Sequence, residues 1–342
     1  MALKTEATPK PKITAVEPNA AIAGGDLVIR GEGFTASGNP TVTLGGEPSQ
    51  LIVTSDTLLV IRVPELSERG DMVVRSGDVK GRTWQAVIGE SIADSLHPVA
   101  NPAVDEEGNI FSTFSGSRGQ KSPVSIYKID PTFISRPFVT DLMNPTGLAF
   151  DRAGLLYASS RYDGIIYQIT PTGNMSVYVE GMGVATGIAF DRDENLYVGD
   201  RSGTIFKISR SRQIYVFATL EPSIAAYHLA FGPDDYLYVS GPTTSSFDAI
   251  HRISKNGEVE TFYRGLGRPQ GLAFDAQDRL YIAASFQGRR GIVRFTEPTK
   301  PEIFVSGPAI VGLAFTPGGD LILATHNSLF RLKLGEHGRL LP

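Results

Sequence analysis

Apolar and polar residues alternate over short runs along this chain, the pattern of strands that expose one face. In the C-terminal part the alternation is clear in IIYQIT, TIFKIS, AIHRIS, GIVRFT and SLFRLK. We find no long segment with the apolar spacing of an amphipathic helix. We therefore predict an all-β protein.

One phrase recurs through the C-terminal part. It reads GLAFDRAGLLYAS at 147–159, and close variants follow at 187–199, 228–240, 271–283 and 312–324. A diverged copy, NPAVDEEGNIFST, occupies 101–113. The aligned anchors lie 40 to 46 residues apart, at Val104, Phe150, Phe190, Phe231, Phe274 and Phe315. That spacing is typical of one four-stranded blade of a β-propeller.

Each copy predicts four strands. G-L-A-F, a D-x-x-G type turn and L-Y-V form a hairpin, and two further alternating runs follow. Six sheets around one axis bury faces that a single sheet would expose. We predict a six-bladed propeller over residues 97–342. Because HGRLLP supplies at best a short last strand, we expect the ring to close with a strand from just before His97.

Residues 12–89 have a different sequence pattern. Short alternating runs such as LVIRG, TVTLG, LLVIRV and MVVRS are separated by Gly, Pro, Asn and Asp. About seven short strands in this length predict an immunoglobulin-like β-sandwich. We expect residues 1–11 to be a flexible tail and residues 90–96 to be a linker.

Both modules resemble known families. Residues 97–342 resemble NHL-repeat propellers and the related gluconolactonase-like family, through the phrase GLAFD…G.LYV…I.KI in all six copies. Residues 12–89 resemble the IPT/TIG family. That resemblance rests on the positions of its turn residues, which are Pro18, Gly24-Gly25, Gly31-x-Gly33-Phe34, Gly45-Gly46 and Pro64. It implies a spacer, adhesion part or interaction domain.

Composition and charge exclude several classes of site and partner. The chain has no cysteine, which excludes disulfides, thiolate zinc sites and cysteine nucleophiles. The formal net charge of −4 is not that of a general nucleic-acid binder, so we expect no DNA partner. No apolar run approaches the roughly 18 residues that span a bilayer. The N-terminal MALKTEATPKPK has no signal core, but the module pairing resembles bacterial envelope proteins and favours a periplasmic or cell-surface location.

The resemblance to metal-dependent lactonases can be tested on single positions. In those enzymes the metal ligands come mainly from the residue before each G-L-A-F strand. The equivalent residues here are Ala100, Thr146, Thr186, Tyr227, Gln270 and Val311. None is a carboxylate, so we expect no metal, no cofactor and no catalytic residue. Asn101 and His97, near the predicted channel, keep hydrolysis as an alternative.

Other motifs in the sequence do not indicate a cofactor or metal site. GMGVATG (181–187) and GLGRPQG (265–271) resemble dinucleotide loops, but no helix follows and both occupy blade-to-blade turns. DRDEN (191–195) resembles the start of a calcium loop, but Leu196 stands where glycine is needed. We interpret it as a strand 1–2 turn.

A binding surface can be placed from the repeat. In a propeller the blade-to-blade turns and the strand 2–3 loops share one face, which we call the mouth face. Its arginines and aromatic residues suit an anionic or sugar-like ligand. The predicted ligand-binding residues are Arg118, Thr146, Arg161, Tyr162, Thr186, Arg201, Tyr227, His228, Gln270, Phe286, Arg289 and His326.

The first functional hypothesis is therefore a non-enzymatic binding protein. Its mouth face would recognise an anionic glycan, an acidic protein segment or a sugar-like ligand. The alternative is a gluconolactonase-like hydrolase or a lyase acting in the same channel. A third interpretation is a structural envelope component without a small ligand.

Overall fold

The computed structural model describes residues 10–67, 69–117, 119–245, 247–335 and 337–338. The chain divides into two compact units. The first comprises residues 1–90 with 289–291 and 303–308, and the second the remaining residues. Every regular element in the described ranges is a β-strand, which confirms the predicted all-β class.

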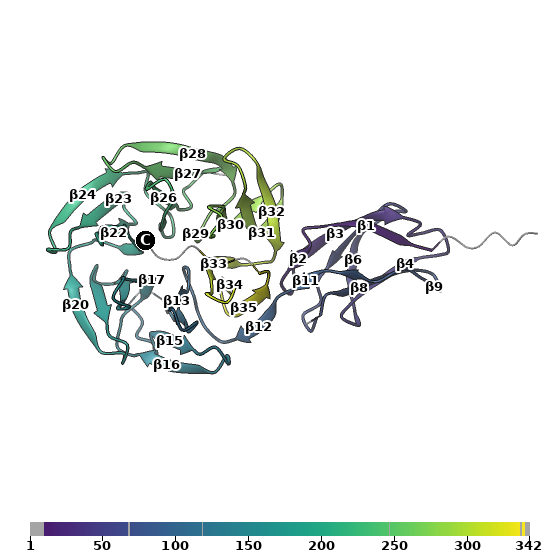
Figure 1. Cartoon of the computed structure of the whole chain (residues 1–342), viewed down its shortest axis with the longest axis horizontal. Helices are drawn as coiled ribbons and strands as arrows, with labels where there is room; N and C mark the ends of the chain where they lie inside the picture. Colours follow the sequence, from purple (N-terminus) through teal and green to yellow (C-terminus); the bar gives the residue numbers. More distant parts are fainter. Residues whose placement is uncertain (1–9, 68, 118, 246, 336, 339–342) are drawn as a thin grey trace, which may run out of the picture. The chain divides into compact units, whose positions relative to one another are not determined.

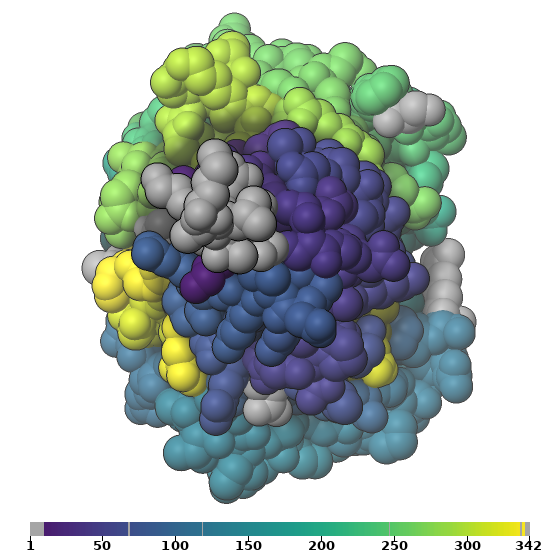
Figure 2. Space-filling model, turned by 90° about the vertical axis from the view of Figure 1, so that its right-hand side faces the viewer, coloured from purple at the N-terminus to yellow at the C-terminus, as the bar shows by residue number. Residues whose placement is uncertain are grey.

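The first unit is a small sandwich, coloured purple and blue in Figure 2. One sheet has the order β1-β3-β7-β6, and the other has the order β10-β8-β4-β5 with β9 on β8. Its strands are β1 (Lys12–Glu17), β2 (Ala20–Ala21), β3 (Asp26–Glu32), β4 (Pro40–Leu44), β5 (Glu47–Pro48), β6 (Gln50–Thr54), β7 (Leu58–Arg62), β8 (Asp71–Ser76), β9 (Val79–Lys80), β10 (Trp84–Gln85) and β11 (Val87–Ile88).

The Gly31-x-Gly33-Phe34 turn anchors the core of the sandwich. Phe34 is fully buried among the alternate residues of both sheets. A Cβ on Gly31 would lie 2.0 Å from the Lys12 carbonyl oxygen and 2.5 Å from the Phe34 ring. Only glycine therefore lets the phenyl ring pass under β3.

The second unit is a six-bladed propeller whose sheets form a ring in Figure 1. Blades one to three contain β13 (Ala103–Val104), β14 (Ile110–Thr113), β15 (Ile126–Ile129), β16 (Ser135–Val139), β17 (Pro145–Phe150), β18 (Leu156–Ser160), β19 (Ile166–Ile169), β20 (Met175–Val179), β21 (Ala185–Phe190), β22 (Leu196–Asp200), β23 (Thr204–Ile208) and β24 (Ile214–Thr219). Blades four to six contain β25 (His228–Phe231), β26 (Leu237–Ser240), β27 (Asp248–Ile253), β28 (Val259–Leu266), β29 (Leu272–Phe274), β30 (Leu280–Phe286), β31 (Arg289–Phe295), β32 (Pro301–Ser306), β33 (Ile310–Phe315), β34 (Asp320–Thr325) and β35 (Leu329–Lys333).

The sixth blade is completed by a strand from earlier in the chain. β12 (Glu90–Ala93) is the outer strand of the sheet β12-β35-β34-β33. The amide of Leu96 also donates to the Asn327 carbonyl oxygen at 2.9 Å. This confirms the expected closure, and residues 90–93, which we assigned to a linker, form the closing strand.

The Phe, Asp and Tyr of the repeated phrase stabilise the strand 1–2 turns and the contacts between blades. Asp151 accepts the amides of Ala153 and Leu155 at 2.9 Å, which fixes the strand 1–2 turn of blade two. Tyr157 donates its hydroxyl to Asp151 at 3.2 Å, and its ring packs edge-on against Phe190 of the next blade. Five blade interfaces hold such a pair, with ring centroids 4.9 to 5.4 Å apart: Phe111–Phe150, Tyr157–Phe190, Tyr197–Phe231, Tyr238–Phe274 and Tyr281–Phe315.

The interface that closes the ring is aliphatic instead. Ile322 stands where the other blades carry the strand-two aromatic residue, and Val104 stands where they carry the anchor Phe. Both belong to one apolar cluster together with Ile110 and Val311. Blades six and one therefore meet without the aromatic pair that the other five interfaces hold.

Candidate functional site

Four of the predicted mouth-face residues are buried in the hub, the set of first strands that surround the propeller axis. Thr146, Thr186, Tyr227 and His228 are 2%, 1%, 3% and 4% exposed. Thr186 donates its hydroxyl to the Gly199 carbonyl oxygen at 2.8 Å and accepts the Tyr227 amide at 3.2 Å. Tyr227 also donates its hydroxyl to a backbone carbonyl. These polar groups connect blades three and four.

The other predicted residues lie nearer the surface. Arg161 donates to the Gly116 carbonyl oxygen at 2.8 Å, and Arg201 to that of Ser223 at 3.3 Å. Tyr162 is 50% exposed. Gln270, Phe286 and Arg289 are half-buried, and His326 is exposed. Arg118 lies outside the described residues. A binding role for this set stays a prediction.

The first strands of neighbouring blades nearly touch at the glycine of the repeated phrase. The amide of Gly187 donates to the Tyr227 carbonyl oxygen at 2.9 Å. A Cβ on Gly187 would lie 2.5 Å from that oxygen, and one on Gly312 would lie 2.4 Å from the Ala100 carbonyl oxygen. Glycine is therefore required for close backbone approach at this level of the hub.

Beyond the glycine level, toward the strand 1–2 turns, the hub encloses a cavity of about 590 Å³. We call it the hub cavity. All six blades contribute their next three residues to its wall, in three successive layers. The layers are Pro102, Leu148, Ile188, Leu229, Leu272 and Leu313; Ala103, Ala149, Ala189, Ala230, Ala273 and Ala314; and Val104, Phe150, Phe190, Phe231, Phe274 and Phe315.

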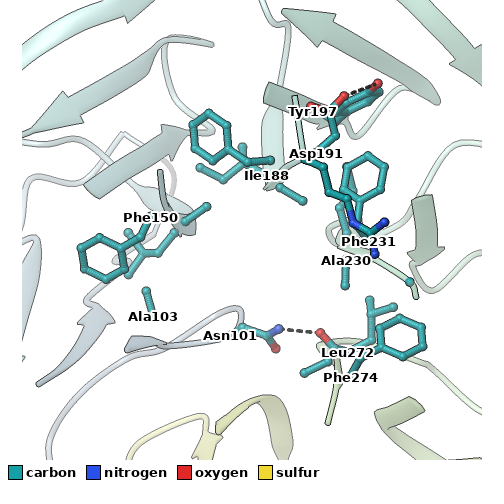
Figure 3. A pocket seen from close by; sticks show the side chains of 18 of the residues that line it. Asn101, Ala103, Phe150, Ile188, Asp191, Tyr197, Ala230, Phe231, Leu272 and Phe274 are labelled. Atoms are coloured by element: carbon teal, nitrogen blue, oxygen red, sulfur yellow. Dashed lines mark hydrogen bonds between the residues drawn. The ribbon is translucent and has the colours of Figure 1, made fainter. Parts of the chain in front are cut away.

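The alanine layer sets the width of the hub cavity. Successive residues of a strand point to opposite sides, so the alanines alternate with the larger Leu and Phe layers. In Figure 3, Ala103 and Ala230 lie nearer the middle of the cavity than the rings of Phe150 and Phe231. One methyl group per blade leaves room that larger side chains would fill. The alanine recurs in every copy of the phrase, but the sequence alone does not indicate that it lines a cavity.

Asn101 lies at the narrow end of the cavity and connects three blades. Its amide nitrogen donates to the Leu272 carbonyl oxygen at 2.8 Å (Figure 3), and its oxygen accepts the Leu313 amide at 3.0 Å. Both polar ends of the side chain are thus engaged with backbone.

Charged groups at the wide end come from blades three and four. Arg192 and Lys255 both pair with Asp235, at 3.0 and 3.1 Å. Asp191 accepts the Tyr197 hydroxyl at 3.1 Å as well as backbone amides of its own turn, as Figure 3 shows in part. Asp191 and Arg192 belong to the DRDEN turn, which the structure confirms as a strand 1–2 turn.

The cavity also extends between blades three and four. Its wall includes Tyr197, Lys207 and Phe217 of blade three and Ile253 of blade four. The Lys207 ammonium lies over the Tyr197 ring, 5.4 Å from its centroid. Apart from Gly338, the described residues that line the cavity from beyond a first strand and its turn all belong to these two blades. The cavity is therefore an apolar bowl with a charged side.

Metal donors are sparse around these residues. Within the ranges that the structure describes, no three His, Asp or Glu side chains are grouped as a metal site. The six positions that carry ligands in the resembled lactonases are mostly buried, and Thr186 and Tyr227 use their hydroxyls in backbone hydrogen bonds.

Burial of His228 makes the stability of the propeller depend on pH. Burial lowers the pKa of its imidazole to about 4 from the ordinary 6.5, because the charged form is poorly solvated there. Between these values the unfolded chain binds the proton and the folded chain does not. We therefore expect the buried His228 to lower the free energy of unfolding by about 2 kcal/mol when the pH falls from 7 to 5.

Urea unfolding of the wild type and His228→Gln at both pH values measures this effect. The variant should lose less stability on acidification than the wild type. An identical pH dependence in the two proteins would contradict the prediction.

Comparison with known families assigns the first unit. Residues 11–83 match the model of the IPT/TIG domain. This chain contains an IPT/TIG domain. The match covers the Gly31-x-Gly33-Phe34 turn and both sheets up to residue 83, and it confirms the resemblance inferred from the turn residues. No curated protein matches the sequence.

Solved structures share the fold of the chain at low sequence identity. A gluconolactonase from Xanthomonas campestris is 17% identical with a TM-score of 0.61, covering 72% of this chain and 89% of that one. An auxiliary nutrient binding protein from Bacteroides ovatus is 12% identical with a TM-score of 0.53, covering 94% and 98%. An inactive variant of virginiamycin B lyase from Staphylococcus aureus is 16% identical with a TM-score of 0.52, covering 96% and 97%.

These likenesses show the propeller fold and leave its activity open, because binding proteins and enzymes both occur among them. In the described ranges, no helix has the length and hydropathy needed to cross a membrane.

Proposed function

We propose that this protein binds a small ligand in the hub cavity and does not transform it. The observation that carries the proposal is the cavity itself, about 590 Å³ in volume and lined by three apolar layers. That volume is in the range of small-molecule sites, which are mostly apolar with a few polar groups to one side. Blades three and four supply such polar groups.

Binding without catalysis is favoured by the chemistry of the hub. The residues that replace lactonase ligands include Ala100 and Val311, which offer no donor to a cation. Asn101 and Thr186 are engaged in hydrogen bonds between blades. The fold likeness to an auxiliary nutrient binding protein supports the same interpretation. An extracytoplasmic location stays a prediction.

A cavity-filling variant tests the proposal. Ala230→Trp places an indole in the alanine layer, whereas Ala153→Trp places one on an exposed turn of blade two. The neutral fluorescent probe N-phenylnaphthylamine should bind the wild type saturably. We expect Ala230→Trp to weaken its binding at least about tenfold, since a filled site loses the buried contact area. Ala153→Trp should bind it as the wild type does.

Equal binding by all three proteins would show that the hub cavity is not the site. Catalysis is tested separately, by incubating the protein and a divalent metal with gluconolactone. Hydrolysis that Ala230→Trp abolishes would overturn the non-enzymatic half of the proposal and establish the alternative.

A further inference from the structure

The strand-three residue that flanks the aromatic pair is basic in five of the six blades. In three of them it is an arginine neutralised by a carboxylate of its own blade. Arg252 donates to Glu260 at 2.9 Å, and Arg294 donates to Glu302 at 2.9 Å. Arg331 donates to Asp320 at 2.6 Å. The cation at this position is normally paired.

The two lysines at this position differ from the arginines. Lys128 and Lys207 lie over the rings of Phe111 and Tyr197, 5.5 and 5.4 Å from the centroids. Both are half-buried, and neither has a carboxylate partner among the described residues. Of these two lysines, Lys207 lines the hub cavity and Lys128 does not. A half-buried ammonium facing a cavity attracts an anion, because the low local polarity strengthens the charge interaction.

No carboxylate forms an ion pair with Lys207 among the described residues, although three aspartates line the same cavity. Asp235 is shared by Arg192 and Lys255, so one carboxylate serves two cations. Asp191 accepts hydrogen bonds from the Tyr197 hydroxyl and from the amides of its turn, which fix the direction of its carboxylate without forming an ion pair with Lys207. Asp193 also lines the cavity, on the exposed part of the turn.

We propose that the ligand of the hub cavity is an amphipathic anion. Its apolar body would occupy the bowl formed by the alanine layer. Its acidic group, a carboxylate or sulfonate, would pair with the Lys207 ammonium between blades three and four. This inference rests on the proposed function, because it concerns the same cavity.

Two fluorescent probes of similar size distinguish the effect of a ligand's charge on binding from the effect of its shape. Anilinonaphthalene sulfonate carries one anionic group, and N-phenylnaphthylamine carries none. We expect Lys207→Met to weaken binding of the sulfonate about tenfold, the effect of losing one charge-assisted hydrogen bond. Binding of the neutral probe should stay within about twofold. Lys207→Arg keeps the charge and should retain the sulfonate.

Lys128→Met is the matched control, since it removes the equivalent lysine over the equivalent ring at a position outside the cavity. It should leave both probes unaffected. Rising salt should weaken sulfonate binding to the wild type more than to Lys207→Met.

The outcomes distinguish the two proposals. If Lys207→Met weakens both probes equally, or neither, the anionic ligand class is wrong while cavity binding can stand. If Lys128→Met has the same effect as Lys207→Met, the charge acts outside the cavity and the inference is overturned. If Ala230→Trp leaves the neutral probe unchanged, the proposed function itself fails.

Discussion

Gly271→Ala should destabilise the propeller by about 3 kcal/mol or more, the upper range for overpacking a tight site. A Cβ there would lie 2.0 Å from the Asn101 side-chain oxygen, 2.6 Å from the Gly312 Cα and 2.9 Å from the Val311 carbonyl oxygen. Two of these atoms belong to the backbone and cannot move alone. Displacing Asn101 would also break its hydrogen bonds to Leu272 and Leu313.

Gly318→Ala is the control for this substitution. Gly318 lies on an exposed turn, and the nearest atom to a new Cβ is the Thr316 hydroxyl at 3.8 Å. Thermal unfolding followed by calorimetry and far-ultraviolet circular dichroism measures both variants. Equal transition temperatures would show that the first strands can separate at little cost, contrary to the close packing of the hub.

Phe34→Ala should lower the free energy of unfolding of the IPT/TIG domain by about 3 to 5 kcal/mol. The ring is fully buried, and its removal leaves a cavity between the two sheets. A small domain has a total stability of only about 5 to 15 kcal/mol. We therefore expect a large part of this domain to be unfolded at moderate urea concentrations.

Trp84 reports on this domain alone, because it is the one tryptophan of the chain and packs against the sandwich core. Urea unfolding followed by its fluorescence measures the loss. Ile52→Ala, at a position 46% exposed on β6, should shift the midpoint little. Similar midpoints for the two variants would contradict the central place of Phe34 in the core.

The fold was largely predictable because its determinants are local and repeated. Each copy contains the Asp that fixes a turn or a substitute for it, and the aromatic residues that pair between blades. Even the exception at the closing interface, Ile322 against Val104, is visible as a paired departure from the repeat. The closing strand was harder to place, because only its spatial neighbour β35 gives residues 90–93 a partner.

The candidate site was less predictable. The sequence indicates which loops share a face, and from this we predicted a mouth face that includes Thr186, Tyr227 and His228. The structure buries these three side chains and places the cavity toward the opposite turns. None of the described residues predicted to bind ligand lines it.

The number of blades and the order of their strands follow from the repeat in the sequence alone. The end at which the hub widens, and the placement of Lys207 but not Lys128 in the cavity wall, depend on the tertiary structure. The reason is physical. Strand pairing follows from local alternation, whereas the width of a channel depends on how closely six backbones approach one another across the ring.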